Sequence, residues 1–517
     1  MLDVLHYLGI GVLHIFTPLD FGMLVLGLLI GMAVSIMPGL GLVMGVVLAL
    51  PFTYRMDIEP SIILLTAIYI SGTYAGCFTA ILYRIPGEPM DVPLLWDGYS
   101  MTQGGRAAKA LGWALVAALT GGLISSAVMV ALAVPFSEMA LKFGPPEYFA
   151  AVFFGFTSIA ALAGKSFVNA FVSLLIGLWI ATIGVDATYG AQRFTFGSHL
   201  LMGGLPYVVI LVGMYGLGEL ISRLGHGLPK IERAKSETHV ATSFPSLGEM
   251  WQIRSTFVRS SILGTILGII PGAGATITSF ISYGIEKQYG KRRKQLGSGV
   301  PEGIVAPQIG STASVAGHMI PLLTLGLPGS GATAVILGAF LLHGVQPGPL
   351  LFTTPSSEVT VYTILASLFA GVIGMCIMGY FWIGVVVKVL QVPQALLSAV
   401  VMVFCIIGAY ADRNSLADVW IIVAFGVLGF LFERFKFPIA PMVLGVILGP
   451  LAESSFIQTM VSYNNDWTVF LRHPISGTLI ILSALALAYP LARDMLARRA
   501  KIAQTKKSEN TTATSPL

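Results

Sequence analysis

The sequence predicts an all-α polytopic membrane protein with roughly 10–12 transmembrane helices in two related repeats. Its composition and long apolar runs predict the membrane class, and four Pro-Gly dipeptides in apolar surroundings predict the repeats. Of the 517 residues, 55% are hydrophobic and only 10% are charged. Soluble globular proteins carry about 25% charged residues, so this chain cannot cover a comparable surface facing water.

Apolar runs recur along most of the chain. A transmembrane helix needs ~20 mostly apolar residues, or somewhat fewer when it is buried among other helices. The runs cover residues 21–36, 107–134, 149–163, 168–183, 200–221, 260–270, 360–390, 396–410, 419–432, 438–448 and 475–491. They are continuous rather than alternating, which excludes a transmembrane β-barrel. Shorter apolar segments beside the Pro-Gly dipeptides complete the expected number of spans.

The chain divides into five segments by polarity. Residues 1–20 lack the basic start and the cleavage site of a signal peptide, so they are expected to form an interfacial helix. Residues 21–222 form the first membrane repeat, 223–259 a polar connection, 260–492 the second repeat with C-terminal helices, and 493–517 a basic and polar tail. The positive-inside rule places this tail and the basic run EKQYGKRRKQ (286–295) in the cytoplasm. Because that rule explains both basic segments, no nucleic-acid partner is expected.

The four Pro-Gly dipeptides form two matched pairs. The first half contains IMPGLG (36–41) and IPGEP (85–89), and the second contains IPGAG (270–274) and LPGSG (327–331). Pro38 and Pro271 stand 233 positions apart, and Pro86 and Pro328 stand 242 apart. The flanks also correspond, with glycines before the first break of each pair and small or hydroxyl residues before the second. This order predicts an internal duplication.

The cost of non-helical backbone inside a membrane indicates a function for these breaks. Non-helical backbone at membrane depth is tolerated only where it is buried in protein or lines a water-filled cavity. Proline suits the first turn of a helix, and glycine lets the backbone turn before it. Each dipeptide is therefore expected to start a half-helix whose free N–H groups point into a cavity, where they suit an anion. Paired broken helices indicate the binding site of a secondary transporter, inverted if each half has an odd number of spans. The alternative is a set of kinks with close helix packing.

The candidate binding residues lie at the breaks: Pro38, Gly39, Gly41, Arg84, Pro86, Gly87, Pro271, Gly272, Gly274, Thr276, Pro328, Gly329, Ser330 and Thr333. A guanidinium beside a helix start could hold a carboxylate in bidentate fashion. The alternatives for Arg84 are an interfacial position or an ion pair with Glu88 or Asp91. Hydroxyls after the third and fourth breaks suit a carboxylate, and backbone carbonyls there suit Na⁺, but such hydroxyls also bond to carbonyls of their own helix.

Two further titratable residues stand in apolar context in the second half. Glu302 could carry a coupling proton or cation, because acidic groups at membrane depth mark ion routes. Its alternative is a helix-start carboxylate at the interface, which the helix dipole favours. His318 could shuttle protons, but a core histidine with satisfied hydrogen bonds is the preferred interpretation, so it is not placed in the site.

These motifs resemble the large membrane subunit of the tripartite tricarboxylate transporter family (TctA-type). The segments that carry the resemblance are VSIMPGLGLVMGVVLALPFTY, YAGCFTAILYRIPGEPMDVPLLWDGYSMTQGGRAAKALG, GIIPGAGATITSFISYGIEKQYGK, PEGIVAPQ and IPLLTLGLPGSGATAVILGAF. The resemblance implies a translocating subunit in the bacterial inner membrane that imports a tri- or dicarboxylate such as citrate. It also implies two partners, a small four-helix membrane subunit and a periplasmic solute-binding protein, and an ion gradient as the driving force. No G-x-x-x-x-G-K-[ST] phosphate loop is present, in agreement with the last point.

The chain departs from this family at several positions. The family often has Glu after the AAP of the second repeat and then an Asn-Asn pair, where this chain has Gln308, Ser311 and Thr312. An asparagine commonly precedes IPGEP, where this chain has Arg84. The residues expected to couple an ion are Glu302, Gln308, Ser311, Thr312 and Thr324, with Na⁺ or H⁺ as the possible ion and no other cofactor.

Two other functions stay open. In a carboxylate or anion channel the breaks would form a selectivity filter, and in a polytopic membrane enzyme Glu88, Asp91 or Glu302 would be catalytic. H-E-x-x-H, C-x-x-C and G-x-S-x-G are absent, so no enzyme motif supports the latter. Cys77, Cys376 and Cys405 lie far apart in apolar stretches and are expected to be small buried hydrophobes.

Overall fold

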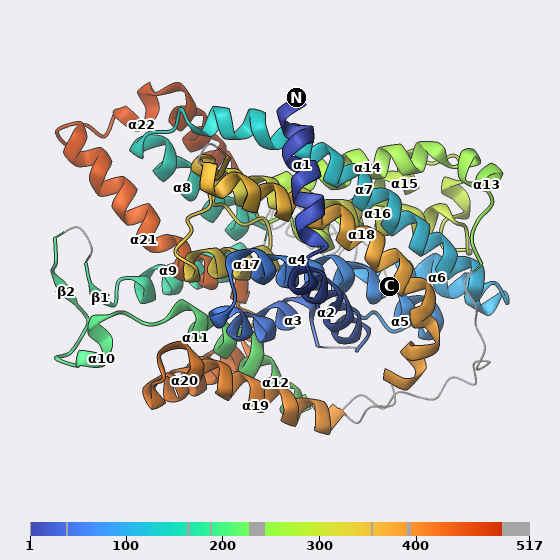
Figure 1. The fold of residues 1–517 in the computed structure, drawn as a ribbon, viewed down its shortest axis with the longest axis horizontal. Helices are drawn as coiled ribbons and strands as arrows, with labels where there is room; N and C mark the ends of the chain where they lie inside the picture. The colour runs from blue at the N-terminus through green and yellow to red at the C-terminus, as the bar shows by residue number, and fades with distance from the viewer. Residues whose placement is uncertain are drawn as a thin grey trace, which may run out of the picture.

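The computed structural model describes residues 2–37, 40–162, 166–186, 189–226, 243–352, 355–389 and 394–488, and nearly all of them are helical (Figure 1). Up to the polar connection the elements are α1 (Leu2–Ile15), α2 (Pro18–Ile36), α3 (Leu42–Ala49), η1 (Leu50–Arg55), α4 (Ile58–Ala75), α5 (Cys77–Tyr83), η2 (Pro89–Asp91), α6 (Leu94–Gln103), α7 (Ala107–Ala140), α8 (Pro145–Leu162), α9 (Phe167–Ala181), β1 (Gly184–Val185), β2 (Gln192–Arg193), α10 (His199–Met202), α11 (Tyr207–Leu211), the π-helical turn η3 (Val212–Leu217) and α12 (Gly218–His226).

The second half follows the same helical pattern. Its elements are α13 (Leu247–Gln252), α14 (Arg254–Ile269), α15 (Gly274–Tyr289), η4 (Arg293–Gln295), α16 (Glu302–Leu325), α17 (Gly331–Leu342), η5 (Pro349–Phe352), α18 (Pro355–Val389), α19 (Gln394–Arg413), α20 (Leu416–Arg434), α21 (Ile439–Ser462) and α22 (Val469–Arg472), with a last apolar helix over Pro474–Ala488. Helices α12 and α14 extend into the predicted connection 223–259 from both sides.

The prediction of an all-α polytopic membrane protein is confirmed. Among the described residues, six helices are long and apolar enough to cross a membrane, and seven shorter apolar helices accompany them. The β1–β2 pair is a short antiparallel hairpin beside α9. Helix α1 packs on α18, where Gly11 lies against the backbone of Tyr362, and its interfacial position stays a prediction.

Two helices, one from each half, form the buried centre. Every residue of α4 from Pro60 to Ala75 is buried, and so is every residue of α16 from Glu302 to Thr324. A helix that is apolar on all sides is expected in the interior of a large protein. The polar groups of these two helices therefore face other helices rather than lipid.

Glycines bring a partner helix against each central helix in the same way. A Cβ at Gly31 of α2 would lie 2.4 Å from the carbonyl oxygen of Ile68 in α4, and a Cβ at Gly264 of α14 would lie 3.0 Å from that of Gly310 in α16. Gly31 and Gly264 stand 233 positions apart, as do Pro38 and Pro271. Ile68 and Gly310 stand 242 positions apart, as do Pro86 and Pro328. The two repeats thus share a helix pair with the same points of closest approach.

Substitution of Gly31 by leucine is expected to destabilise the protein by about 2 kcal/mol or more, because a side chain there would push α2 away from α4. Gly22→Leu in the same helix is the matched control, since a Cβ at Gly22 meets no atom within 4 Å. Thermal unfolding of the purified protein in detergent measures both changes. Equal melting temperatures for the two variants would contradict the packing.

The repeats are interleaved rather than separate. Helix α7 of the first half packs on α16, with Gly121 against Thr312, and α18 of the second half packs on α4, with Gly379 against Tyr74. Around this centre α21 packs on α9, and α19 and α20 lie with α12 along one edge (Figure 1).

Candidate functional site

A helix ends before each of the four Pro-Gly dipeptides, and another helical element begins after it. Helices α2, α5, α14 and α16 end before the dipeptides, and α3, η2, α15 and α17 follow them. Pro38 and Gly39 lie outside the described residues. The expectation that the prolines occupy the first turn of a helix is wrong, because α15 and α17 begin at Gly274 and Gly331, three residues after their prolines. After Gly87 the chain forms only the single turn η2 before α6.

Corresponding breaks have corresponding backbone conformations. Helix α5 ends at Arg84 (φ 57°) and α16 ends at Gly326 (φ 70°), each in the left-handed conformation and two residues before a proline. Helices α2 and α14 end in an extended residue, Met37 (ψ 110°) and Ile270 (ψ 116°). Residues at the predicted offsets thus adopt the same conformation, which supports the duplication.

A reciprocal capping box follows the Pro-Gly dipeptide at the second and fourth breaks. At the fourth break the Ser330 N–H donates to Thr333 Oγ1 (2.8 Å) and the Thr333 N–H donates to Ser330 Oγ (3.3 Å). At the second break Glu88 and Asp91 form the same box, with the Glu88 N–H donating to Asp91 Oδ2 (2.8 Å). Capping boxes satisfy N–H groups at the start of a helix. The two boxes differ in chemistry, because the first repeat uses carboxylates and the second uses hydroxyls.

The four breaks meet. The Leu42 N–H at the start of α3 donates to Glu88 Oε1, which joins the first break to the second. The Ser279 hydroxyl of α15 donates to the Met90 carbonyl (2.7 Å), and the Gly272 N–H donates to the Gly329 carbonyl (3.1 Å).

The fourth break in turn lies against the first. A Cβ at Gly331 would lie 3.4 Å from a methyl of Val43 in α3. Val43 and Gly331 are 288 positions apart in the sequence, and Tyr69 and His318 beside them are 249 apart. The fold brings the described residues of the four breaks together, and residues 40–43, 84–91, 270–274 and 326–333 are here called the four-break cluster.

A buried hydrogen-bond chain adjoins the fourth break. The Tyr69 hydroxyl of α4 bonds to His318 Nδ1 of α16 (2.7 Å) and to Ser330 Oγ (3.1 Å). His318 is fully buried, and within the described residues no group bonds to its Nε2. The Tyr215 hydroxyl of η3 is also buried, and it has no hydrogen-bond partner among the described residues. It lies 3.2 Å from the position that a Cβ at Gly331 would take. π-Helical turns occur frequently at functional sites.

Arg84 lies in a pocket beside the second break. Its guanidinium lies 5.7 Å from the ring centre of Tyr99, and the residue is exposed. Among the described ion pairs none joins Arg84 to Glu88 or Asp91. The pocket, of about 380 Å³, also contains Lys287 and is therefore basic. A larger pocket of about 630 Å³ reaches Gly326, the residue equivalent to Arg84, from the side of α9 and α21.

The hydroxyls predicted to couple an ion bond to their own helix. Thr312 and Ser311 donate to the Gln308 carbonyl (2.8 and 3.0 Å), and Thr324 donates to Ile320 (2.7 Å). Gln308 donates to the Thr73 carbonyl (3.3 Å). Its Oε1 has no partner within the described residues. Thr312 also lines a cavity of about 10 Å³ between α7, α16 and α18, about the space of one water.

Among the described contacts, none joins the Glu302 side chain to the four-break cluster. It is the first residue of α16 and pairs with Arg292 (2.7 Å) in the basic connection 286–295. This position agrees with the alternative interpretation of Glu302, that of a carboxylate at the start of a helix. Thr278 bonds back to the Gly274 carbonyl (2.8 Å), and for the half-buried Thr276 no hydrogen bond is described.

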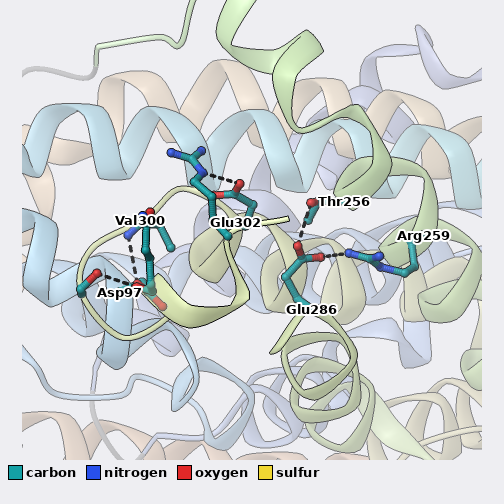
Figure 2. Close-up of polar contacts among 9 residues, drawn as sticks. Asp97, Thr256, Arg259, Glu286, Val300 and Glu302 are labelled. Carbon is teal, nitrogen blue, oxygen red and sulfur yellow. Dashed lines mark hydrogen bonds and ion pairs between the residues drawn. The ribbon is translucent and has the colours of Figure 1, made fainter. Parts of the chain in front are cut away.

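Asp97 is an organising residue that the sequence did not reveal. Its fully buried carboxylate accepts hydrogen bonds from the N–H groups of Gly297 (2.9 Å), Gly299 (2.9 Å) and Val300 (3.0 Å). Figure 2 shows Asp97 pointing into this loop, beside the start of α16. In the same view Glu286 of α15 faces Arg259 and Thr256 of α14. Asp97 thus fixes the loop between α15 and α16 to α6.

Comparison with known proteins places the chain in a family. Residues 21–444 match the sequence profile of the tripartite tricarboxylate transporter TctA family. An uncharacterized 52.8 kDa protein in the TAR-I ttuC' 3' region of Agrobacterium vitis is 34% identical over 502 residues, which covers 97% of this chain and 99% of that protein. An uncharacterized protein in the TAR-II ttuC' 3' region of the same organism is 35% identical over 239 residues, or 46% of this chain and 98% of that protein. No solved structure matches.

The matched region contains all four breaks and both capping boxes. The two relatives are themselves uncharacterized, so the assignment of this chain rests on the match to the family profile. The resemblance seen in the sequence motifs is confirmed: the chain is a multi-pass membrane protein that belongs to the tripartite tricarboxylate transporter TctA family.

Proposed function

We propose that this chain is the large translocating subunit of a tripartite, ion-gradient-driven secondary transporter that imports a tri- or dicarboxylate of the citrate type. Its partners are a small four-helix membrane subunit and a periplasmic binding protein that delivers the substrate. The complex lies in the bacterial inner membrane with the C-terminus in the cytoplasm, as the basic segments predict. Family membership supports the transporter class.

The observation that carries the proposal is the meeting of four helix breaks beside two fully buried central helices. Irregular backbone inside a membrane protein is tolerated where it is buried in protein or lines a cavity, and discontinuous helices form the substrate sites of secondary transporters. The second-repeat part of the cluster suits a carboxylate, because the hydroxyls of Ser330, Tyr69 and Tyr215 gather at the start of α17. Hydroxyl and N–H donors at a helix start favour an anion.

Two pockets support alternating access to this cluster. One reaches Arg84 and the other reaches Gly326, and these two residues occupy equivalent positions of the two repeats. If the repeats are inverted, the pockets open toward opposite sides of the membrane. Arg84 and Lys287 then make one entrance basic, which raises the local concentration of an anionic substrate.

Uptake by proteoliposomes that contain the three subunits tests this function. We expect saturable uptake of one or more carboxylates that requires the binding protein and an imposed H⁺ or Na⁺ gradient. Currents far above carrier rates and independent of the binding protein would indicate a channel instead. Chemical conversion of a carboxylate by the purified protein would indicate an enzyme.

Tyr69→Phe is expected to lower the kcat/KM of uptake about tenfold, because it leaves His318 and Ser330 without their shared hydrogen-bond partner in a buried site. The measurement is initial uptake rate against substrate concentration. Tyr410→Phe on the exposed surface of α19 is the matched control and should leave the rate unchanged. Wild-type kinetics for Tyr69→Phe would place the substrate elsewhere.

A further inference from the structure

The two capping boxes of the four-break cluster occupy equivalent positions but have different chemistry. Glu88 corresponds to Ser330 and Asp91 to Thr333, because each pair is separated by 242 positions, as Pro86 and Pro328 are. A site that only bound an anionic substrate between two like halves would have neutral donors in both. The carboxylates of the first repeat repel an anion, so they need a different role.

Glu88 and Asp91 are both withdrawn from solvent. Their exposed fractions are 7% and 1%. Among the ion pairs of the described residues none involves either carboxylate. An isolated buried charge is strongly unfavourable, and a buried carboxyl group without a cationic partner tends to bind a proton.

The two helices on either side of the first break, α2 and α3, present donors to this pair. The Leu42 N–H of α3 donates to Glu88, and the Glu88 N–H donates to Asp91. The Ser35 hydroxyl of α2 is fully buried, lies close to the Glu88 carboxylate, and has no hydrogen-bond partner within the described residues.

In the described part of the chain, the other titratable groups near the pair are the carboxylate of Glu219 in α12 and the thiol of Cys77 in α5. Both are negative when ionised, and neither can neutralise Glu88 or Asp91. A hard cation such as Na⁺ requires a shell of oxygen ligands, whereas the Leu42 N–H already occupies Oε1 of Glu88 and the Glu88 N–H occupies Oδ2 of Asp91. The surroundings therefore favour a bound proton over a bound cation.

We propose that Glu88, seated against Asp91, is the coupling-proton site of this transporter, while the hydroxyl box of Ser330 and Thr333 serves the substrate carboxylate. The proposal rests on the proposed function and divides its two tasks between the two repeats. A proton from water on one side binds a Glu88 carboxylate oxygen and returns to water on the other side, so no further reactant is needed.

The contact between Glu88 and Leu42 gives this proton a structural effect. The ionised carboxylate accepts the Leu42 N–H strongly and holds the first break to the second, because hydrogen bonds to a charged acceptor are about twice as strong as neutral ones. A proton on Glu88 weakens that bond and frees the start of α3. Protonation thus shifts the equilibrium between two arrangements of the first-repeat breaks.

Glu88→Gln separates the two tasks in the reconstituted tripartite complex. With citrate as the probe, the variant is expected to lose accumulation driven by a proton gradient, together with the pH dependence of uptake. It should keep exchange of internal for external citrate, since exchange needs no net proton movement. The matched control Glu433→Gln, at an exposed position of α20, should accumulate citrate as the wild type does.

The outcomes distinguish this inference from the proposed function. If the wild-type complex takes up none of a panel of carboxylates, the proposed function fails. If the wild type accumulates substrate with a proton gradient and Glu88→Gln does so equally well, or if only a Na⁺ gradient drives the wild type, the inference is overturned. Should Glu88→Gln not fold, Glu88→Asp moves the carboxylate and is expected to shift the pH midpoint of uptake; an unchanged midpoint overturns the inference.

Discussion

Substitution of Gly272 by valine is expected to abolish uptake, with a loss of at least about 100-fold, which corresponds to about 2.7 kcal/mol. Gly272 has φ 87°, a conformation that a β-branched residue avoids. A Cβ there would lie 2.6 Å from Ile159 Cα in α8, and backbone atoms cannot move aside as a flexible side chain can. The valine therefore has to displace the third break.

That displacement breaks the joint between the third and fourth breaks, because the Gly272 N–H donates to the Gly329 carbonyl. Gly329 in turn lies against His318, where a Cβ would be 2.4 Å from the imidazole ring. The change at Gly272 thus reaches the Tyr69–His318–Ser330 chain through two contacts.

Gly284→Val in α15 is the matched control, since a Cβ at Gly284 meets no atom within 4 Å. Uptake by proteoliposomes and the elution profile of the purified variant measure function and folding separately. A folded Gly272→Val protein with wild-type uptake would show that the joint between the breaks is dispensable.

The sequence predicts the breaks well because proline and glycine act locally. Proline removes an N–H and fixes φ, and glycine accepts φ values that other residues avoid, so their effect does not depend on distant residues. The apolar runs predict the helices for a similar reason. The similar offsets of Pro38 with Pro271 (233) and of Pro86 with Pro328 (242) then predict the duplication that the helix ends display.

The partners of the buried polar groups could not be predicted in this way. Helices such as α4 and α16 are buried on all sides, so periodicity does not show which face meets which neighbour. The contacts of Tyr69 with His318 and of Asp97 with Gly297 join residues 249 and 200 positions apart. Only the packing of the two repeats brings them together.

Arg84 shows the limit of an argument from position in the sequence. It stands two residues before a Pro-Gly dipeptide, which suggested that its guanidinium meets the substrate at the break. Its left-handed conformation ends α5, and its side chain lies over Tyr99 of α6 in a pocket that Lys287 also lines, a neighbourhood that its position in the sequence did not predict. Its contact with the substrate stays a prediction. The equivalence of Glu88 and Ser330 is a signal that the sequence did contain, because both directly follow a matched Pro-Gly pair.

Asp97→Asn is expected to destabilise the protein by about 3 kcal/mol or more, since a buried acceptor of several hydrogen bonds becomes partly a donor. The carboxylate accepts from three backbone N–H groups and from the Tyr283 hydroxyl (3.1 Å). An asparagine has one carbonyl oxygen, and its NH₂ group would face N–H donors. All three backbone N–H groups donate to Oδ1, so an amide oxygen in its place would bond to them without its charge and therefore more weakly. The amide nitrogen would replace Oδ2, which accepts from the Tyr283 hydroxyl and from the Gly297 N–H in a fully buried place.

The consequence extends beyond local stability because Asp97 joins the two repeats. It lies on α6, directly after the second break, and it holds the loop that leads into the buried helix α16. We expect Asp97→Asn to lower both the melting temperature in detergent and the yield of folded protein. Asp466→Asn, in an exposed loop, is the matched control. Equal melting temperatures for the two variants would mean that other contacts hold this loop, and that α6 and α16 can move independently during transport.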